Sequence, residues 1–333
     1  MQSKYCKYFL LLIILCTLLL FFGTMDYVNY GLFIRSDNNH GNRLDKSLPK
    51  HKLLVVVPGF SFQPASLALV LRNIEALQGD TRISVSCLIY HYTYPSHIFF
   101  NASQSEDAYK LRTYCDISAY SGSDYGYYVK AVNPALARQG GFTHIMLLLD
   151  DVELKNFHVG DFMDIMTYNN LTLASPAVQQ GQFPCNRREN IGDEPGGTVT
   201  AIEIFAAVFT MDAFACFWTM VDPFTNYIGW GYDLYFQFFC TAIGHPQRLG
   251  IITYKDMTVV HRPQVAKGDH TPRSVLKDTF LQQAVQQEED IRGVLRTRYG
   301  IALPLAKDLR ERTQDIPLVD HMPLKLPRHL LPP

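Results

Sequence analysis

Short apolar runs alternate with segments of helical spacing through the first half of the chain. Residues 53–57, 83–90 and 142–149 are rich in apolar and β-branched side chains, as is typical of strands that are buried on both faces of a parallel sheet. Residues 66–77 and 125–137 carry apolar side chains at helical spacing and end close to glycine. Strands that alternate with helices in this way predict an α/β fold with a mostly parallel, Rossmann-like sheet flanked by helices.

The pattern beyond residue 170 is less regular but predicts the same classes of element. Further strands are expected at residues 171–177, 199–210 and 250–254. Further helices are expected at residues 212–221, 232–242 and, as one or two pieces, 272–299. Asp212 is the expected N-cap of the first of these helices. The segments expected to be irregular are residues 91–115, a long loop at residues 179–198 and a loosely packed, proline-rich tail from Pro317.

An apolar segment at residues 8–28 follows Lys4 and Lys7 and has two interpretations. A cleaved signal peptide has the same basic head and apolar core, but no small-x-small cleavage site follows this segment. We therefore favour an uncleaved signal anchor, although a spanning helix typically needs ~20 apolar residues. The lysines then place residues 1–7 in the cytosol. Residues 29–50 form a stem, and the remainder of a single-pass type II protein lies in the lumen of the Golgi or the ER.

Sequons and cysteines agree with a lumenal domain. Asn101 and Asn170 each begin an N-x-S/T triplet, the acceptor for N-glycosylation. No CxxC spacing is present, so a structural zinc site is not expected. Five of the seven cysteines lie beyond the anchor, and their number is odd, so at least one is unpaired or intermolecular; they are Cys87, Cys115, Cys185, Cys216 and Cys240. Their pairing does not follow from their spacing.

Composition narrows the classes of function. The chain has 333 residues, 47% apolar content and a formal net charge of −1. That length and apolar content suffice for a substantial core, and the near-neutral charge argues against a nucleic-acid partner, which usually needs a basic face. The motifs GxxxxGK[ST], GxGxxG, HExxH and GxSxG are all absent from the sequence. A nucleotide cofactor of the usual dehydrogenase or kinase kind is therefore not expected.

Three acids follow the predicted strand at residues 142–149. Asp150, Asp151 and Glu153 stand where ligands bind in α/β sheets, beyond the carboxyl end of a strand. One interpretation is that these acids cap a helix or turn. The other is a site for a divalent metal, Mn²⁺ or Mg²⁺, because hard cations take carboxylate and diphosphate oxygens. His261 ends a later apolar run and completes the metal shell if the fold returns it to the acids.

The sequence GWGYD supplies a second candidate site. Its two glycines permit a tight turn, Trp230 offers a flat apolar face, and Asp233 stands at the start of a predicted helix. These features fit an N-cap beside a core tryptophan. They equally fit a platform for a sugar, with Asp233 as a general base that takes a proton from an attacking hydroxyl.

This arrangement resembles the GT-A-type glycosyltransferases of the secretory pathway. The resemblance implies that Asp151 and Glu153 form an Asp-x-Asp-like metal motif and that His261 ligates the same metal. It implies that the segment containing Gly231 and Asp233 supplies the base or an acceptor contact, and that Lys130, on the preceding helix, faces the nucleotide. The implied catalytic domain covers residues 51–265, followed by a helical extension and tail at residues 266–333.

Residues 142–262 also resemble a plant-type family of uncharacterised membrane-anchored proteins, sometimes labelled as related to lysine-ketoglutarate reductase trans-splicing. The chain departs from that family in having Leu149-Asp150-Asp151-Val152-Glu153-Leu154 where the family tends to have Trp-Asp-Glu-Asp-Leu, and Ala207 where it tends to have proline. The first departure leaves the register of the metal motif open by one residue. The matching segments are Ser175-Pro176-Ala177, Glu203 to Phe209, Cys216 with Trp218, Trp230 to Asp233, and Val260-His261.

The favoured hypothesis is a membrane-anchored transferase that moves a sugar from a metal-bound nucleotide sugar to a hydroxyl of a glycan or glycoconjugate. Glu203 would position the donor or acceptor, Trp230 would line the acceptor site, and the loop at residues 179–198 would close over the donor. One alternative is a noncatalytic glycan-binding or scaffolding protein with the same fold, because fold alone does not determine function. The other is a metal-dependent hydrolase that uses the same acids on a phosphate ester.

Overall fold

A computed structural model describes most of the chain beyond residue 50. The described residues all belong to one compact unit, Leu44–Pro333. The predicted cytosolic tail, anchor and stem at residues 1–50 lie outside them. No helix within the described ranges is both long and apolar enough to cross a membrane. Those ranges are residues 51–60, 63–91, 105–119, 125–179, 186–191, 195–223, 229–262, 273–305 and 322–331.

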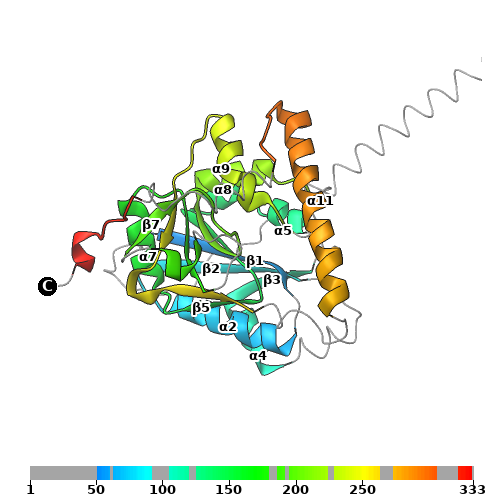
Figure 1. The fold of residues 1–333 in the computed structure, drawn as a ribbon. Helices are drawn as coiled ribbons and strands as arrows, with labels where there is room; N and C mark the ends of the chain where they lie inside the picture. Colours follow the sequence, from blue (N-terminus) through cyan, green and yellow to red (C-terminus); the bar gives the residue numbers. More distant parts are fainter. Residues whose placement is uncertain are drawn as a thin grey trace, which may run out of the picture. The chain divides into compact units, whose positions relative to one another are not determined.

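A ten-stranded sheet runs through the described residues, in the order β3-β2-β1-β4-β8-β6-β10-β5, with β9 paired to β6 and β7 paired to β9 (Figure 1). Its first half is wholly parallel, as the sequence predicts. The strands of that half are β1 (His51–Phe60), β2 (Ile83–His91), β3 (Cys115–Ala119) and β4 (His144–Leu148). We call the edge at which β1 and β4 end the carboxyl edge, and the edge at which they begin the amino edge.

The second half of the sheet is mixed, which corrects the prediction of a mostly parallel sheet. β8 runs antiparallel to both β4 and β6, β5 runs antiparallel to β10, and β7 runs antiparallel to β9. An apolar run reveals that a strand is buried but not its direction, so the sequence pattern could not show this. The strands of this half are β5 (Val152–Lys155), β6 (Leu173–Val178), β7 (Gly196–Val199), β8 (Ala206–Thr210), β9 (Leu249–Ile252) and β10 (Thr258–His261).

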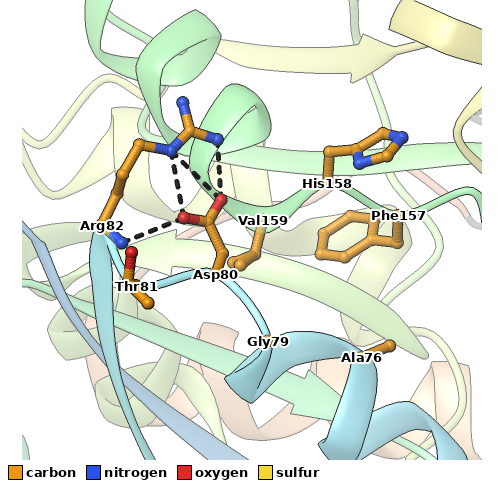
Figure 2. A pocket seen from close by; sticks show the side chains of 8 residues that line it. All are labelled: Ala76, Gly79, Asp80, Thr81, Arg82, Phe157, His158 and Val159. Atoms are coloured by element: carbon orange, nitrogen blue, oxygen red, sulfur yellow. Dashed lines mark hydrogen bonds and ion pairs between the residues drawn. The ribbon is translucent and has the colours of Figure 1, made fainter.

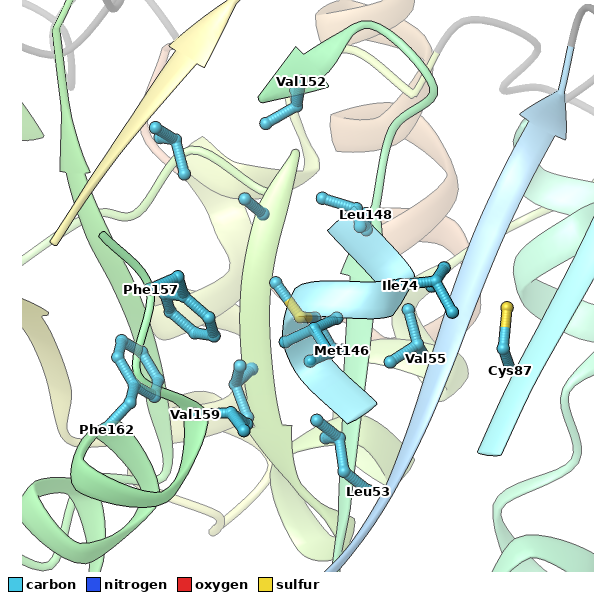
Figure 3. Close-up of a cluster of buried hydrophobic side chains, with 14 of the residues drawn as sticks. Leu53, Val55, Ile74, Cys87, Met146, Leu148, Val152, Phe157, Val159 and Phe162 are labelled. Carbon is cyan, nitrogen blue, oxygen red and sulfur yellow. The ribbon is translucent and has the colours of Figure 1, made fainter. Parts of the chain in front are cut away.

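Helices cover both faces of the sheet (Figure 1). α2 (Pro64–Gln78), α4 (Glu106–Tyr114) and α7 (Val159–Tyr168) share one hydrophobic core with β1 and β4. Figure 3 shows that core, with Ile74 of α2 beside Val55 of β1 and Met146 and Leu148 of β4. The helices associated with the other face are α5 (Tyr125–Ala131), α6 (Pro134–Gln139), α8 (Met211–Met220), α9 (Tyr232–Ala242) and α11 (Arg273–Tyr299).

The alternation of side chains along β1 explains its continuous apolar sequence. Leu53, Val55 and Val57 belong to the core beneath α2, whereas Leu54 and Val56 are equally buried but point to the opposite face. A strand covered on both faces has no polar position, as the sequence predicts for this run.

Three predicted elements differ from the structure because helices begin at residues that the sequence analysis did not recognise as N-caps. The helix predicted at residues 125–137 is divided, because Pro134 begins α6 and the Asn133 side chain caps it by accepting from two backbone N–H groups. Helix α4 lies in a segment predicted to be irregular; Ser105 caps it by accepting from Ala108 N. The N-cap of α8 is Thr210, which accepts from Ala213 N, and not the predicted Asp212.

The described part of the C-terminal segment is packed, contrary to the predicted loose tail. Leu324 N donates to Gly196 O at 2.9 Å, and Thr198 N donates to Met322 O at 3.1 Å, which adds this segment to the free side of β7. The Tyr254 hydroxyl also donates to Leu330 O at 3.2 Å. Backbone pairing holds a segment whose sequence carries little periodicity.

Two disulfides connect neighbouring elements. Cys87–Cys115 joins β2 to β3, and Cys216–Cys240 joins α8 to α9. Four of the five cysteines beyond the predicted anchor are therefore paired, and Cys185 lies outside the described residues.

Candidate functional site at the carboxyl edge

Asp150 and Asp151 form the turn that connects β4 to β5, at the carboxyl edge. β4 is parallel to β1, so this turn lies where an open α/β sheet usually receives its ligands. The chain then reverses into β5, which pairs with β10 so that Val152 lies opposite His261. The pairing returns His261 to the acids, as the sequence-based hypothesis requires.

Asp151 and His261 are in direct contact. Asp151 Oδ2 lies 3.1 Å from His261 Nε2. The second carboxylate oxygen, Oδ1, is buried and has no hydrogen-bond partner among the described residues. The His261 ring stacks on Phe205, with ring centroids 5.2 Å apart. A buried carboxylate oxygen without a partner is costly, so its presence indicates a position where a ligand atom or a cation can be bound.

Glu153 is engaged by an arginine that the sequence analysis did not single out. Arg262 Nε donates to Glu153 Oε2 at 2.6 Å, and Arg262 N donates to Asp151 O at 2.6 Å. Among the described residues, no group of three or more His, Cys, Asp or Glu side chains is arranged to hold a metal ion. Asp151 and His261 are of residue types that can bind a divalent cation and lie in contact, whereas Glu153 would first have to leave Arg262.

Glu203 lies on a neighbouring segment of the same edge. Leu148 pairs with Ala206 across antiparallel strands, so the residues before β8 continue beyond the end of β4. Leu149 N donates to Phe205 O at 3.0 Å, which ties this segment to the acid turn. Glu203 itself is only 4% exposed. The fold thus brings a further buried carboxyl group to the carboxyl edge, and the role of Glu203 in positioning donor or acceptor stays a prediction.

Trp230, Gly231 and Asp233 form the approach to α9. Trp230 Nε1 donates to Glu288 Oε1 of α11 at 2.8 Å. Gly231 has φ +91°, and a Cβ there would lie 2.9 Å from Glu288 Cγ, so a side chain is excluded on both grounds. Asp233 Oδ1 accepts from Leu234 N at 2.9 Å. The turn is therefore built against α11, and the sugar platform and general base remain predictions.

Lys130 packs against α8. Its Nζ donates to the carbonyl oxygen of Trp218 and lies 3.9 Å from the centroid of that indole, while Trp218 Nε1 donates back to Lys130 O at 3.1 Å. Burial, with a smaller effect from Arg298, lowers the pKa of Lys130 to about 8, against the opposing effect of Asp222. These contacts give Lys130 a structural role, and its predicted nucleotide contact gains no support.

A pocket of about 430 Å³ lies at the amino edge, and none of the predicted site residues lines it. Figure 2 shows the side chains that do. Arg82 dominates its polar side: its Nη2 donates to Asp80 Oδ2 at 2.7 Å and to Asp161 Oδ1 at 2.8 Å. None of the predicted catalytic or metal residues lines this pocket, so its volume does not locate the chemistry. Its lining residues are Ala76, Gly79, Asp80, Thr81, Arg82, Phe157, His158 and Val159.

The acids of the amino edge are held by several partners each. The hydrogen bonds from Arg82 hold the pKa of Asp80 below its ordinary value. Burial raises the pKa of Asp161, but hydrogen bonds from Lys255 and Arg82 outweigh burial and leave that pKa lowered. Asp80 Oδ2 also accepts from Gly160 N at the start of α7, at 3.1 Å. This network ties α7 to the start of β2.

No protein-family model matches the chain, and no curated protein matches it; the label of the plant-type family therefore has no support from either. Among solved structures, the chain is similar to S. aureus TarS residues 1–349 in complex with UDP-GlcNAc, with TM-score 0.45, 11% identity, and 74% of this chain and 71% of that chain covered. A longer S. aureus TarS structure gives TM-score 0.43 at 11% identity, over 81% of this chain and 43% of that chain. TarS 1–349 gives TM-score 0.41 at 11% identity, over 81% and 79%. Likenesses at this level do not bear on the site or on the function.

Proposed function

We propose that the chain is a glycosyltransferase that moves a sugar from a metal-bound nucleotide sugar to a hydroxyl of a glycan or glycoconjugate. The observation that carries this proposal is the contact of Asp151 with His261 at the carboxyl edge. Asp151 Oδ1 is buried there and has no hydrogen-bond partner in the part of the chain that the structure describes. A carboxylate is a suitable ligand for Mn²⁺ or Mg²⁺, and the imidazole favours Mn²⁺ of the two because Mg²⁺ takes oxygen ligands. The position at the end of a buried strand is where α/β sheets bind nucleotides.

Each residue of the site has a proposed part. Asp151 and His261 hold the cation, Asp150 assists from the same turn as Asp151, and Glu153 assists from β5. The cation, when bound, supplies positive charge that stabilises a leaving diphosphate. Glu203 positions the donor or acceptor from the neighbouring segment, where it is already buried. Asp233, whose Oδ1 accepts from Leu234 N, takes the proton of the acceptor hydroxyl.

A second candidate is a noncatalytic glycan-binding or scaffolding protein with the same fold. The observation that favours it is the ion pair of Glu153 with Arg262, which occupies one of the proposed metal ligands. Such a protein would keep binding to a nucleotide or glycan but show no turnover with any donor and acceptor.

We also propose a lumenal location, in the Golgi or the ER, with a type II anchor at residues 8–28. The two disulfides support it because disulfides persist in oxidising compartments. The sequon residue Asn170 is exposed on a turn after α7, where an oligosaccharide can be attached. Treatment of the expressed full-length protein with endoglycosidase should increase its mobility on a gel, and a protein with no glycan would contradict this location.

Calorimetry of the full-length protein with UDP, GDP and other nucleotides, with and without Mn²⁺, tests the proposed function. We expect one nucleotide to bind only with Mn²⁺, and Asp151→Ala/Glu153→Ala to abolish that binding. A matched control is Asp212→Ala/Glu289→Ala, which likewise removes one Asp and one Glu; each of these pairs with an arginine, and their side chains are 92% and 42% exposed. If the folded wild type binds no nucleotide, the proposal is wrong. Metal-dependent binding without turnover on an acceptor panel would favour the noncatalytic candidate.

A further inference from the structure

Asn73 of α2 contacts the strand that carries the acids. Its side chain is 2% exposed. Its Nδ2 donates to Val152 O at 2.7 Å, and its Oδ1 accepts from Leu154 N at 3.1 Å. These two hydrogen bonds are made with the residues on either side of Glu153. The amide therefore fixes the backbone of β5 around Glu153, the last residue of the proposed metal motif.

The amide of Asn73 makes hydrogen bonds to the backbone of β5 that a neighbouring strand would otherwise make. β5 is the last strand in the order of the described sheet, and β10 satisfies only one of its sides. The backbone groups of Val152 and Leu154 on the other side are covered by α2 and would be unsatisfied if an apolar side chain replaced the amide. The neighbouring buried positions of α2, such as Val70, Ile74 and Leu77, are apolar. An asparagine among them is therefore explained by these two bonds.

Asn186 makes the same pattern of contacts at the other carboxylate segment. It is fully buried, its Nδ2 donates to Ala201 O at 2.9 Å, and its Oδ1 accepts from Glu203 N at 2.9 Å. In both cases one side-chain amide pairs with the C=O of one residue and the N–H of the residue two further on. Both segments that carry acids to the carboxyl edge are thus held by a buried asparagine.

We propose that Asn73 is a positioning residue for the metal motif, acting through β5 on Asp151 and Glu153; this inference rests on the proposed function. Residues that orient metal ligands without touching the metal are needed because a cation demands a defined separation of its ligands. Asn73 fixes the path of β5 relative to α2, and the same strand is fixed to β10, where His261 stands. Asn186 does the same for Glu203.

The chain supplies a matched control in Asn169. Its side chain is 8% exposed, its Nδ2 donates to Lys325 O at 2.9 Å, and its Oδ1 accepts from Lys325 N at 2.8 Å. It is therefore also a buried asparagine with two bonds to a distant backbone. Its partner belongs to the C-terminal segment and carries none of the proposed site residues.

The test compares Asn73→Leu with Asn169→Leu in the full-length protein, by calorimetry with Mn²⁺ and the nucleotide that the wild type binds. We expect Asn73→Leu to weaken Mn²⁺-dependent binding about 10-fold to 100-fold, the usual effect of losing a residue that orients metal ligands. Asn169→Leu should leave that affinity unchanged while lowering the unfolding temperature. In hydrogen exchange, Asn73→Leu should also remove the protection of the Leu154 amide, which Asn169→Leu should retain.

Equal nucleotide affinities in the two variants, or an unchanged Leu154 amide in Asn73→Leu, would overturn the inference. Asn73→Ser, which leaves room for a bridging water, replaces Asn73→Leu if the latter does not fold. A folded wild type that binds no nucleotide would contradict the proposed function. Exchange at Leu154 would still show whether Asn73 holds β5, so the two failures are distinguishable.

Discussion

At the amino edge of the sheet Arg82 contacts three carboxylates, whereas at the carboxyl edge one buried oxygen of Asp151 has no hydrogen-bond partner within the described ranges. Arg82 contacts Asp80, Asp161 and Asp164, and Lys255 Nζ adds a bond to Asp161 at 2.9 Å. Asp151 contacts His261 through Oδ2 only. The two edges therefore have different roles. At the amino edge, charged side chains with several protein partners join elements together, whereas at the carboxyl edge a buried oxygen without a partner is available to a ligand.

Two arginines make this comparison quantitative. The side chains of Arg82 and Arg262 have nearly equal exposure, 46% and 44%. Arg82 contacts three acids, of which Asp161 is 7% exposed. Arg262 forms an ion pair with Glu153, which is 19% exposed. Because the two arginines are equally exposed, any difference between the effects of replacing them on stability would come from the acids that they contact.

The largest expected effect is that of Arg82→Leu. Without the guanidinium, Asp161 and Asp164 keep their negative charge at nearly buried positions but lose one cation. We expect the free energy of unfolding to fall by about 2–3 kcal/mol, because the largely buried carboxylates lose a charged hydrogen-bond donor that is itself only half-buried. Urea denaturation measures the change. Mn²⁺-dependent nucleotide affinity should remain that of the wild type, and its loss would contradict the division between the two edges.

Acid should destabilise the amino edge through His144. Burial, with a smaller effect from His51, lowers the pKa of His144 from 6.5 to about 4. Between these values the unfolded chain binds more protons than the folded one, so stability is full above pH 6.5 and falls as the pH drops towards 4. At pH 5 the loss is about 2 kcal/mol.

The variant His144→Phe, which cannot titrate, should remove that part of the acid sensitivity. Unfolding measured at pH 7 and pH 5 should show a smaller difference for this variant than for the wild type. His245→Phe, at an exposed histidine, is the control and should keep the wild-type difference. Equal acid sensitivity in wild type and His144→Phe would contradict the assignment to His144.

The smallest expected effect is that of Arg262→Leu. Its ion pair with Glu153 is partly accessible to solvent and involves one acid, which is less buried than Asp161, so the free energy of unfolding should change by less than about 1 kcal/mol. Because Glu153 is released, Mn²⁺ should bind more tightly if Glu153 is a metal ligand. Calorimetry with Mn²⁺ alone measures this. A loss of stability as large as that of Arg82→Leu would show that the carboxyl edge is also a structural network.

Much of the first half of the fold could be predicted because its signals are local. The continuous apolar run of β1 and the helical spacing of α2 are properties of adjacent residues, and both elements occur where expected. The direction of β8 could not be predicted, because it depends on which distant strands accept it. The packing of the C-terminal segment likewise depends on β7 and Asn169 and not on its own sequence.

The candidate site divides in the same way. Asp151 and His261 were predicted to meet, and the pairing of β5 with β10 brings them together. Arg262 was missed, although it follows His261 directly; a cation beside a proposed metal ligand was the available signal. Asn73 was missed because its bonds reach 79 and 81 residues along the chain. The available signal was an amide on the apolar face of a predicted helix.

The central claim is tested most directly by Mn²⁺-dependent nucleotide binding in Asp151→Asn and Asp161→Asn, with unfolding measured on the same samples. Each variant removes one largely buried carboxylate charge and keeps its shape. The account predicts that Asp151→Asn loses nucleotide binding while its stability changes by less than about 1 kcal/mol. Asp161→Asn should bind as the wild type does but lose about 2 kcal/mol of stability. Undiminished binding in Asp151→Asn, with the wild type binding a nucleotide, would contradict the placement of the site at the carboxyl edge.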